Sequence, residues 1–415
     1  MRVLIVNTSE KAGGAAVAAH RLTDALNNHG VKAKMLVRDK TTDTLTVVGL
    51  PRSPLLRWHF LWERLVVFCR LHFQRKHLFE VDIANTGTDI TRLPEFQEAD
   101  IIHLHWVTQG MLSLKDIRKI LRSGKPVVWT MHDIWPATAV CHLTLNCRRF
   151  TTQCRECRLL SRRSGLVTSV WRRKQKMLAE GHVYFVACSH WLASEAKASA
   201  LLKGHKITNI PNPIDTRIYK RCDRQEARQR LGLPTDKRLL LFVSQRVTNP
   251  NKGMDYLVEA CRLLHSELSF EVVILGGHAE DVVEQLPMKA HPLGYVSDDH
   301  QIVDIYNAVD MFVLPSLSEN LPNTIMEAMA CGVPSVGFNV GGIPEEIDHK
   351  KNGYVAAYRD AEDLARGIRW VLEADAEALS AHCLRKVAQN YSPSAVAMRY
   401  TEVYNQALAM KHYKL

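Results

Sequence analysis

Residues 315–346 read PSLSENLPNTIMEAMACGVPSVGFNVGGIPEE, and this stretch decides the fold. The apolar run 311–314 before it predicts a buried strand. TIMEAMA then predicts a helix, PSVGF a second strand, and a Gly-Gly turn follows. Strand, loop, helix and strand in this order are typical of a parallel α/β unit, which binds ligands at the carboxyl ends of its strands.

Two carboxylates stand eight positions apart in this stretch. Glu319 falls in the predicted loop and Glu327 in the predicted helix. The start of a helix offers backbone N–H groups and a positive dipole end to phosphate. Ionised carboxylates accept hydrogen bonds from sugar hydroxyls. Together these features favour a nucleotide sugar as ligand, although a single Glu is more often an exposed surface residue.

The stretch resembles the E-x7-E signature of retaining, family 4 type glycosyltransferases, and ACGVPSVGFNVGGIPEEI and KNGYV match that family's usual continuation. The resemblance implies that Glu319 lies beside the donor sugar and that Glu327 binds the ribose hydroxyls. It also implies that Asn320 and Leu321 line the donor site.

The same resemblance implies an α/β protein of the GT-B fold, in which two Rossmann-like domains face each other across a cleft. Residues 1–209 would form the acceptor-binding domain, and residues 210–391 would bind the nucleotide-sugar donor. A helix within residues 392–415 would cross back to the first domain. A length of 415 residues suits two domains, and contents of 46% hydrophobic and 23% charged residues are ordinary for a globular protein.

The net charge of +11 is unevenly distributed. Basic residues are in excess in residues 1–209, whereas residues 210–415 are net acidic. A basic half implies an anionic partner. Because no DNA- or RNA-binding motif is present, an anionic lipid surface or a diphosphate-linked acceptor is favoured over nucleic acid. No apolar run is long enough to span a membrane, and MRVLIVN begins a strand, so we expect a cytoplasmic protein.

The first strand, RVLIVN, precedes a helix that Gly13 and Gly14 open and that ends near Gly30. This is a geometry that lets phosphate approach the backbone. By the resemblance, the loop approaches the donor diphosphate or the acceptor. The alternative is that the glycines only permit close packing.

Two further predicted strands, in residues 99–107 and 125–136, each deliver histidine at the carboxyl end. His103 and His105 flank one residue and therefore point to the same side of their strand. The string TMHD-x-WP resembles the family, whose corresponding histidine faces the reacting sugar. His132 is therefore the catalytic candidate and His105 a secondary one, whereas a histidine at a strand end is otherwise usually structural.

Residues 238–264 predict a strand, a basic loop and a helix. Arg246 and Lys252 on this loop can clamp a diphosphate, and the string resembles the family's donor-diphosphate loop. They would stabilise the departing diphosphate without a catalytic metal.

The strand FEVVILGG follows and ends at Gly277, which we include among the donor-binding candidates. By the resemblance, Tyr295 and Val296 line the pocket for the base.

Cys141, Cys147, Cys154 and Cys157 have the spacing C-x5-C-x6-C-x2-C. Four thiolates at this spacing can close a structural Zn²⁺ site, and His142 could replace one of them. The alternative is a set of reduced, buried thiols. A similar loop occurs in a bacterial exopolysaccharide subgroup of the family that includes colanic-acid type enzymes.

Residues 55–79 have helical apolar spacing, with Trp58 and Trp62 among basic residues. Residues 148–176 add ten Lys or Arg against one acid, Glu156. Such a helix can lie in a membrane interface, so we predict peripheral attachment to an anionic inner leaflet. A helix packed on the core is the alternative. The basic residues assigned to this face are Arg57, Arg64, Arg70, Arg75 and Lys76.

The predicted reaction is transfer of a hexosyl unit from a nucleotide-diphosphate sugar, with retention, to a saccharide or lipid-linked saccharide of a bacterial surface polysaccharide. A nucleotide-sugar epimerase of the same fold and an inert scaffold in a polysaccharide assembly complex are the alternatives.

Overall fold

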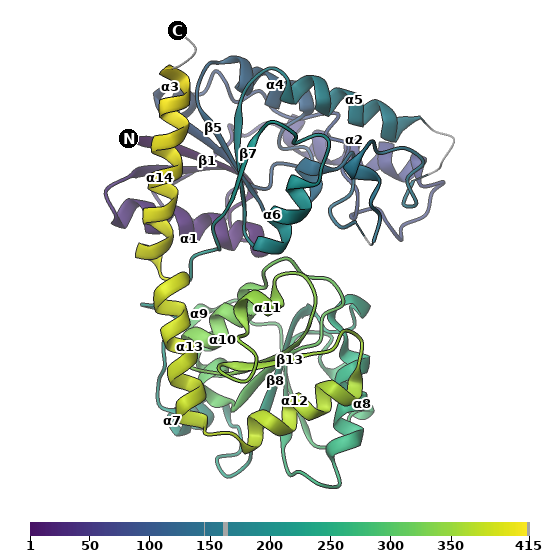
Figure 1. Ribbon diagram of the computed structural model, residues 1–415, viewed down its shortest axis with the longest axis vertical. Coiled ribbons are helices and arrows are strands. Elements are labelled where there is room, and N and C mark those ends of the chain that lie inside the picture. Colours follow the sequence, from purple (N-terminus) through teal and green to yellow (C-terminus); the bar gives the residue numbers. More distant parts are fainter. Residues whose placement is uncertain (145, 161–164, 413–415) are drawn as a thin grey trace. The chain divides into compact units, whose positions relative to one another are not determined.

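A computed structural model describes residues 1–144, 146–160 and 165–412, which form two compact units (Figure 1). Unit 1 comprises Met1–Pro211 and Val396–Leu415, and unit 2 comprises Asn212–Ala395. Arg162 and Arg163 of the predicted basic run lie outside the described residues, as do residues 413–415 of the predicted terminal helix.

Unit 1 is built on a seven-stranded parallel sheet in the order β3-β2-β1-β4-β5-β6-β7. In chain order its strands are β1 (Arg2–Ser9), β2 (Lys32–Asp39), β3 (Val47–Gly49), β4 (Ile101–Leu104), β5 (Val127–Met131), β6 (Val183–Ala187) and β7 (Lys206–Asn209). Its helices are α1 (Gly14–Asn28), α2 (Pro54–Arg70), α3 (Pro94–Glu98), α4 (Leu114–Arg122), α5 (Leu166–Leu178), α6 (His190–Lys197) and the carboxyl-terminal α14 (Pro393–His412). The strand order reverses between β1 and β4, which is the topological switch point of a doubly wound sheet.

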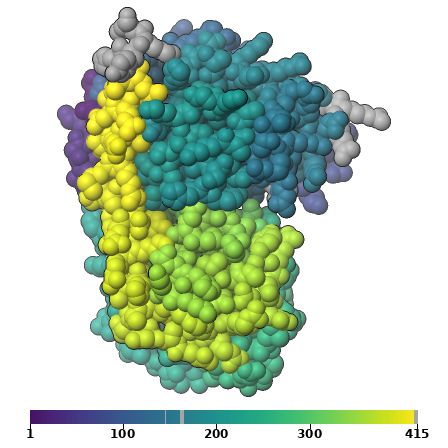
Figure 2. All heavy atoms as spheres, in the orientation of Figure 1, coloured from purple at the N-terminus to yellow at the C-terminus, as the bar shows by residue number. Residues whose placement is uncertain are grey.

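Both faces of this sheet are covered, and the alternation along β1 shows how. Leu4 and Val6 pack into one core with α2, α4, α5 and α6, whereas Val3 and Ile5 pack into a second core with α1 and α14. The strand is therefore a continuous apolar run. Figure 2 shows α14, in yellow, on the surface of unit 1.

Unit 2 is built on a six-stranded parallel sheet in the order β10-β9-β8-β11-β12-β13. Its strands are β8 (Leu239–Arg246), β9 (Glu271–Gly277), β10 (Ala290–Gly294), β11 (Met311–Leu314), β12 (Ser335–Phe338) and β13 (Gly353–Ala356). Its helices are α7 (Arg224–Leu231), α8 (Met254–Leu264), α9 (Asp299–Ala308), α10 (Asn323–Ala330), α11 (Ile343–Glu346), α12 (Ala361–Glu373) and α13 (Ala376–Asn390). The prediction of two parallel Rossmann-like sheets, with a long terminal helix contacting the first, is confirmed.

The predicted helical segment 55–79 is too long. Helix α2 ends at Arg70, because His72 and Phe73 adopt left-handed backbone conformations with φ of 53° and 64°. Such conformations end an α-helix and are uncommon for residues other than glycine. Over the described residues, no helix is both long and apolar enough to span a bilayer.

Candidate functional site

Three loops of unit 2 meet backbone to backbone at the carboxyl ends of β8, β11 and β12. Gly253, with φ +75°, would place a Cβ 1.9 Å from the carbonyl oxygen of Pro315. Gly341, with φ +59°, would place one 1.8 Å from the carbonyl oxygen of Glu319. A side chain at either position would push the loops apart, so both glycines are needed for the close approach. The loops of Lys252 and Glu319 therefore touch.

The ion pair between Lys252 and Glu319 joins two of these loops. Lys252 Nζ donates a hydrogen bond to Glu319 Oε1, and the Leu317 N–H donates to the Asn251 carbonyl at 2.8 Å. The side chains remain 30% and 14% exposed, respectively. A diphosphate can replace the carboxylate as the partner of the ammonium group.

Glu327 is anchored from the neighbouring helix. It is buried on α10, where its Oε2 accepts a hydrogen bond from the Tyr306 hydroxyl of α9 at 3.1 Å. Burial, reinforced by the charge of Glu327, raises the pKa of Tyr306 well above its usual value. Tyr306 therefore remains a donor, and the Glu327 carboxylate is held in place as an acceptor.

Glu346 is a member of this region that the sequence analysis missed. Its side chain on α11 is fully buried, and neither carboxylate oxygen has a hydrogen-bond partner among the described residues. Burial, together with the charge of Glu319, raises the pKa of Glu346 well above its usual value. The spacing from Ile343 and to Ile347, both buried, puts position 346 on the inward face of a helix, a signal that could have identified it.

The remaining donor candidates lie at the same edge of the unit 2 sheet. Arg246, the exposed last residue of β8, pairs in register with Gly277 of β9. Tyr295 and Val296 follow β10 at the side of the sheet, two strands from β8, and Tyr295 is 66% exposed. Asn320 and Leu321 follow Glu319 directly, with Leu321 buried.

In unit 1, three histidines form a row at the carboxyl ends of β4 and β5. The ring centroids of His103 and His105 are 4.3 Å apart, as expected for one side of a strand. His105 Nδ1 and His132 Nε2 are hydrogen-bonded at 2.9 Å. Burial lowers the pKa of His103 to about 3 and that of His132 to about 4, and burial with the neighbouring histidines lowers that of His105 well below its usual value. All three are neutral at pH 7.

A buried network of charges lies beside His132. Asp133 accepts hydrogen bonds from Trp106 Nε1 at 2.9 Å and from His142 Nδ1 at 2.7 Å, and His142 Nε2 is 2.6 Å from Asp82 Oδ2. Burial alone would lower the pKa of His142, but Asp133 and Asp82 outweigh it and raise this pKa to about 10. His142 is therefore an imidazolium between two carboxylates.

This network corrects one assignment. Arg64 is not a solvent-exposed residue of α2, because its side chain is buried and donates to Asp82. Its neighbour Glu63 is also buried, and its Oε1 accepts from the N–H groups of Ile83 and Ala84. Arg57, Arg70, Arg75 and Lys76 are exposed, as predicted.

Gly13 and Gly14 are exposed and open α1, with Gly13 at φ +89°. A Cβ on Gly13 would meet nothing within 4 Å, so its backbone conformation, not close packing, favours glycine there.

The predicted zinc site finds no support. Within residues 1–144, 146–160 and 165–412, no group of three or more His, Cys, Asp or Glu side chains is placed to hold a metal ion. Cys141, Cys147, Cys154 and Cys157 are partly buried free thiols. Burial raises the pKa of Cys141 to about 12 and that of Cys154 to about 11, so both thiols are protonated in the metal-free chain.

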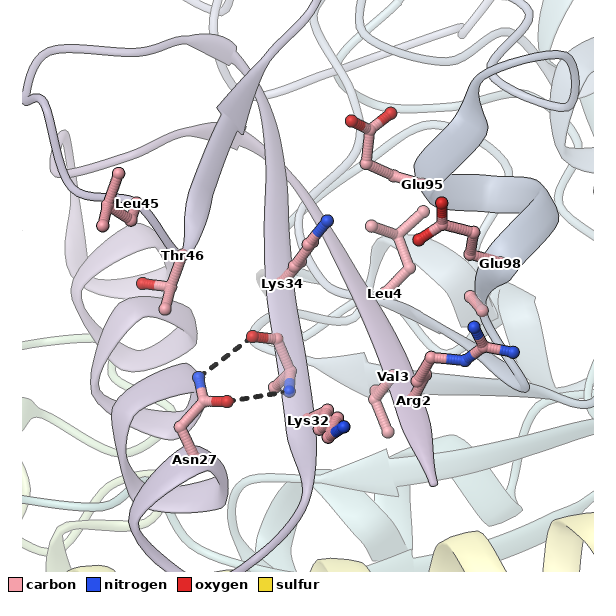
Figure 3. Close-up of a pocket in the computed structure, with 12 residues that line it drawn as sticks. Arg2, Val3, Leu4, Asn27, Lys32, Lys34, Leu45, Thr46, Glu95 and Glu98 are labelled. Carbon is pink, nitrogen blue, oxygen red and sulfur yellow. Dashed lines mark hydrogen bonds between the residues drawn. The ribbon is translucent and has the colours of Figure 1, made fainter.

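A pocket of about 370 Å³ lies near the amino ends of β1 and β2 in the unit 1 sheet, whereas the histidine row lies at the carboxyl ends of the strands (Figure 3). Lys34, Glu95 and Glu98 lie along it. The Asn27 amide next to it hydrogen-bonds both the N–H and the carbonyl of Ala33 at 2.9 Å. The histidine row is not part of this pocket.

Comparison with known families assigns almost the whole chain. Residues 12–218 match the family described as Glycosyltransferase Family 4, and residues 223–390 match Glycosyl transferases group 1.

Among curated relatives, the uncharacterized glycosyltransferase MJ1607 of Methanocaldococcus jannaschii is 26% identical over 80% of this chain and 90% of its own length. The putative teichuronic acid biosynthesis glycosyltransferase TuaC of Bacillus subtilis is 36% identical over 44% of this chain, and the match spans 45% of TuaC.

Among solved structures, HepE of Anabaena in complex with UDP-glucose has a TM-score of 0.63 and 17% identity, covering 98% of this chain and 100% of HepE. At this identity the likeness concerns the fold. With both sequence halves matched and both sheets in place, the chain belongs to the retaining, family 4 (group 1) glycosyltransferases of the GT-B fold.

Proposed function

We propose that the protein transfers a hexosyl unit from a nucleotide-diphosphate sugar to a saccharide or lipid-linked saccharide of a bacterial surface polysaccharide. Family membership supports sugar transfer from a nucleotide sugar. HepE, of the same fold, binds UDP-glucose, which makes a UDP-sugar the first donor to test. The name of TuaC refers to teichuronic acid biosynthesis, which favours a surface polysaccharide. Membership of the colanic-acid type subgroup stays a prediction.

The contact between Lys252 and Glu319 is the observation that carries the proposal. In the free protein each side chain is the counter-charge of the other. Donor binding would give Lys252 the diphosphate as a new partner, with Arg246 beside it, and would release Glu319 to accept from a sugar hydroxyl. Glu327, held by Tyr306, would accept from the ribose. Charge develops on the departing diphosphate, so cations held there in advance stabilise the transition state.

His132 would contact the reacting sugar. Because it is neutral at pH 7, it can form hydrogen bonds to hydroxyls without adding a charge to the reacting sugar. Unit 1 would also hold the acceptor. Gly13 and Gly14 would let it approach the backbone at the start of α1.

The test of this function combines binding and transfer. UDP-, GDP- and ADP-sugars are titrated calorimetrically into the wild type, Lys252→Met and the matched control Lys237→Met. Lys237 is exposed and precedes β8, so it lies at the amino end of this strand, opposite to the end that carries Arg246. We expect one donor to bind, Lys252→Met to lose transfer, and Lys237→Met to behave as the wild type. Binding of no donor, or equal transfer by all three proteins, would contradict the proposal.

We further propose that α2 holds unit 1 against an anionic membrane surface. Four large apolar side chains on it, Trp58, Leu61, Trp62 and Leu65, are 42–52% exposed. The Trp58 and Trp62 rings stack with centroids 5.4 Å apart. Exposed basic residues flank them, so the surface combines interfacial aromatic groups with positive charge. A lipid-linked acceptor would be delivered to the same unit.

A further inference from the structure

The histidine row determines which nitrogen of His132 carries its proton. His132 Nε2 and His105 Nδ1 are hydrogen-bonded at 2.9 Å, so one of these two nitrogens is the hydrogen-bond donor and the other is the acceptor. A neutral imidazole has one N–H, and both rings are neutral at pH 7. The direction of this single hydrogen bond therefore sets the tautomer of both rings.

The other nitrogen of His105 decides the direction. His105 Nε2 is buried and has no hydrogen-bond partner among the described residues. A buried N–H without an acceptor is rarer and more costly than a buried lone pair without a donor. His105 therefore carries its proton on Nδ1 and donates it to His132 Nε2. His132 must then carry its own proton on Nδ1.

One neighbour of His132 Nδ1 is a group that a hydroxyl can replace. The Cys188 Sγ lies 3.5 Å from this nitrogen, and a thiol sulfur is a weaker hydrogen-bond acceptor than a sugar hydroxyl. The negative charge of Asp133 acts on His132, but that carboxylate is already held by His142 and Trp106. Burial raises the pKa of Cys188 well above its usual value, so the thiol stays neutral.

The terminal helix holds the far end of the row. His103 Nδ1 is 2.8 Å from the Tyr404 hydroxyl, and His103 Nε2 is 2.7 Å from Thr130 Oγ1. Thr130 Oγ1 is in turn 2.9 Å from the Tyr400 hydroxyl. Because both nitrogens of His103 are hydrogen-bonded to hydroxyl groups, its ring is held in place against the ring of His105.

We propose that His105 is a positioning residue that fixes His132 as the Nδ1–H tautomer, so that His132 presents a hydrogen-bond donor to an oxygen of the donor sugar. This rests on the proposed function, in which His132 contacts that sugar. The new inference extends the proposed function in two ways. It assigns the hydrogen bond to the sugar to one atom, His132 Nδ1, and it gives His105, which does not touch the sugar, a part in the reaction.

The variants that test this differ in where they place an amide. His105→Asn puts an N–H near the site of Nδ1 and keeps the donor, whereas His105→Gln puts it near Nε2, and His105→Ala removes it. We expect His105→Asn to be within about threefold of wild-type kcat and the other two variants to lose about 10- to 100-fold, the loss typical when the partner that orients a metal-bound imidazole is removed. Nucleotide affinity and KM should change little.

A control of the same kind separates tautomer from folding. His205 is half-buried in unit 1. Its Nδ1 accepts a hydrogen bond of 3.3 Å from the N–H of Val183, which lies at the amino end of β6. His205→Gln should change the melting temperature but not kcat. If the three variants at position 105 lose kcat only in proportion to their melting temperatures, His105 is merely structural and the inference is wrong.

The tautomer itself can be read without any substrate. In protein labelled with ¹⁵N-histidine, the two ring nitrogens have different shifts according to which one is protonated, and the His132 signals are assigned by their loss in His132→Asn. We expect the Nδ1–H form in the wild type and a mixture in His105→Ala. The Nε2–H form in the wild type would overturn the inference. Absence of transfer with every donor would instead contradict the proposed function and leave the tautomer result standing.

Discussion

Replacing Glu346 should make unit 2 more stable, which is an unusual expectation for a fully buried residue. Its carboxyl group has lost its hydration and has no hydrogen-bond partner among the described residues. A buried polar group without a partner costs about 1–3 kcal/mol. Glu346→Met removes the polar group at nearly constant shape, so most of this cost should be recovered.

The gain should depend on pH. A carboxyl group whose pKa is raised in the folded state keeps its proton there, over a pH range in which the unfolded chain has already released it. This pH-dependent part of the cost is therefore absent below the unfolded pKa of about 4.3, grows as the pH rises above it, and is complete above the raised pKa of the folded state, whereas the cost of the unpartnered neutral group remains at every pH. The wild type should thus lose stability relative to Glu346→Met between mildly acidic and neutral pH.

Thermal unfolding monitored by circular dichroism at pH 5 and pH 8 measures both effects. For a domain of about 150–250 residues, 1 kcal/mol corresponds to about 2–4 °C, so a gain of about 2 kcal/mol raises the melting temperature by about 4–8 °C. Glu346→Gln should flatten the pH dependence with a smaller gain, because an amide remains without partners.

Glu284→Gln, at an exposed position of unit 2, is the matched control and should leave the melting temperature unchanged. A loss of stability at both pH values in Glu346→Gln and Glu346→Met would refute the reasoning, because it would mean that the carboxyl group forms a stabilising hydrogen bond or ion pair in the folded protein.

Three further predictions concern the donor and the membrane. Glu327→Gln should weaken nucleotide binding in calorimetry by about 1.5–3 kcal/mol through its charged acceptor, and Tyr306→Phe by about 0.5–1.5 kcal/mol, because it removes only the neutral donor that holds Glu327. Lys252→Met should lower kcat by about 100- to 1000-fold in steady-state kinetics, because one transition-state donor is lost; a loss confined to KM would contradict this. The double variant Trp58→Ser and Trp62→Ser should sediment less with anionic liposomes, and high salt should release the wild type.

The sequence predicted the sheets well because their signal is local. The buried strands are short apolar runs, and Gly or polar residues bound them, so β8, β9, β11 and β12 fall where expected. The end of α2 was missed because His72 and Phe73 take positive φ without being Gly or Asn. Neither His nor Phe is a residue at which helices usually end in the left-handed conformation, so nothing in the sequence signals this end.

The candidate site was predictable in part. Glu319 and Lys252 were chosen from separate motifs, and the structure joins them in an ion pair that neither motif contains. The pairing of Asp82 with Arg64 and with His142 was not predictable, since the partners are 18 and 60 residues away in the sequence. Such pairings are decided by tertiary packing, which a local window does not show.

Helix α2 shows why charge counting alone misjudged a surface. Trp58, Leu61, Trp62 and Leu65 recur at i, i+3, i+4 and i+7, which is the stripe that a helix normally turns inward, yet these side chains face solvent while Glu63 and Arg64 are buried. Burial of an apolar surface is favourable at about 25 cal/mol per Å², whereas a buried ion pair adds little stability. The membrane attachment proposed above would cover this stripe, with the exposed arginines beside it as contacts to an anionic surface.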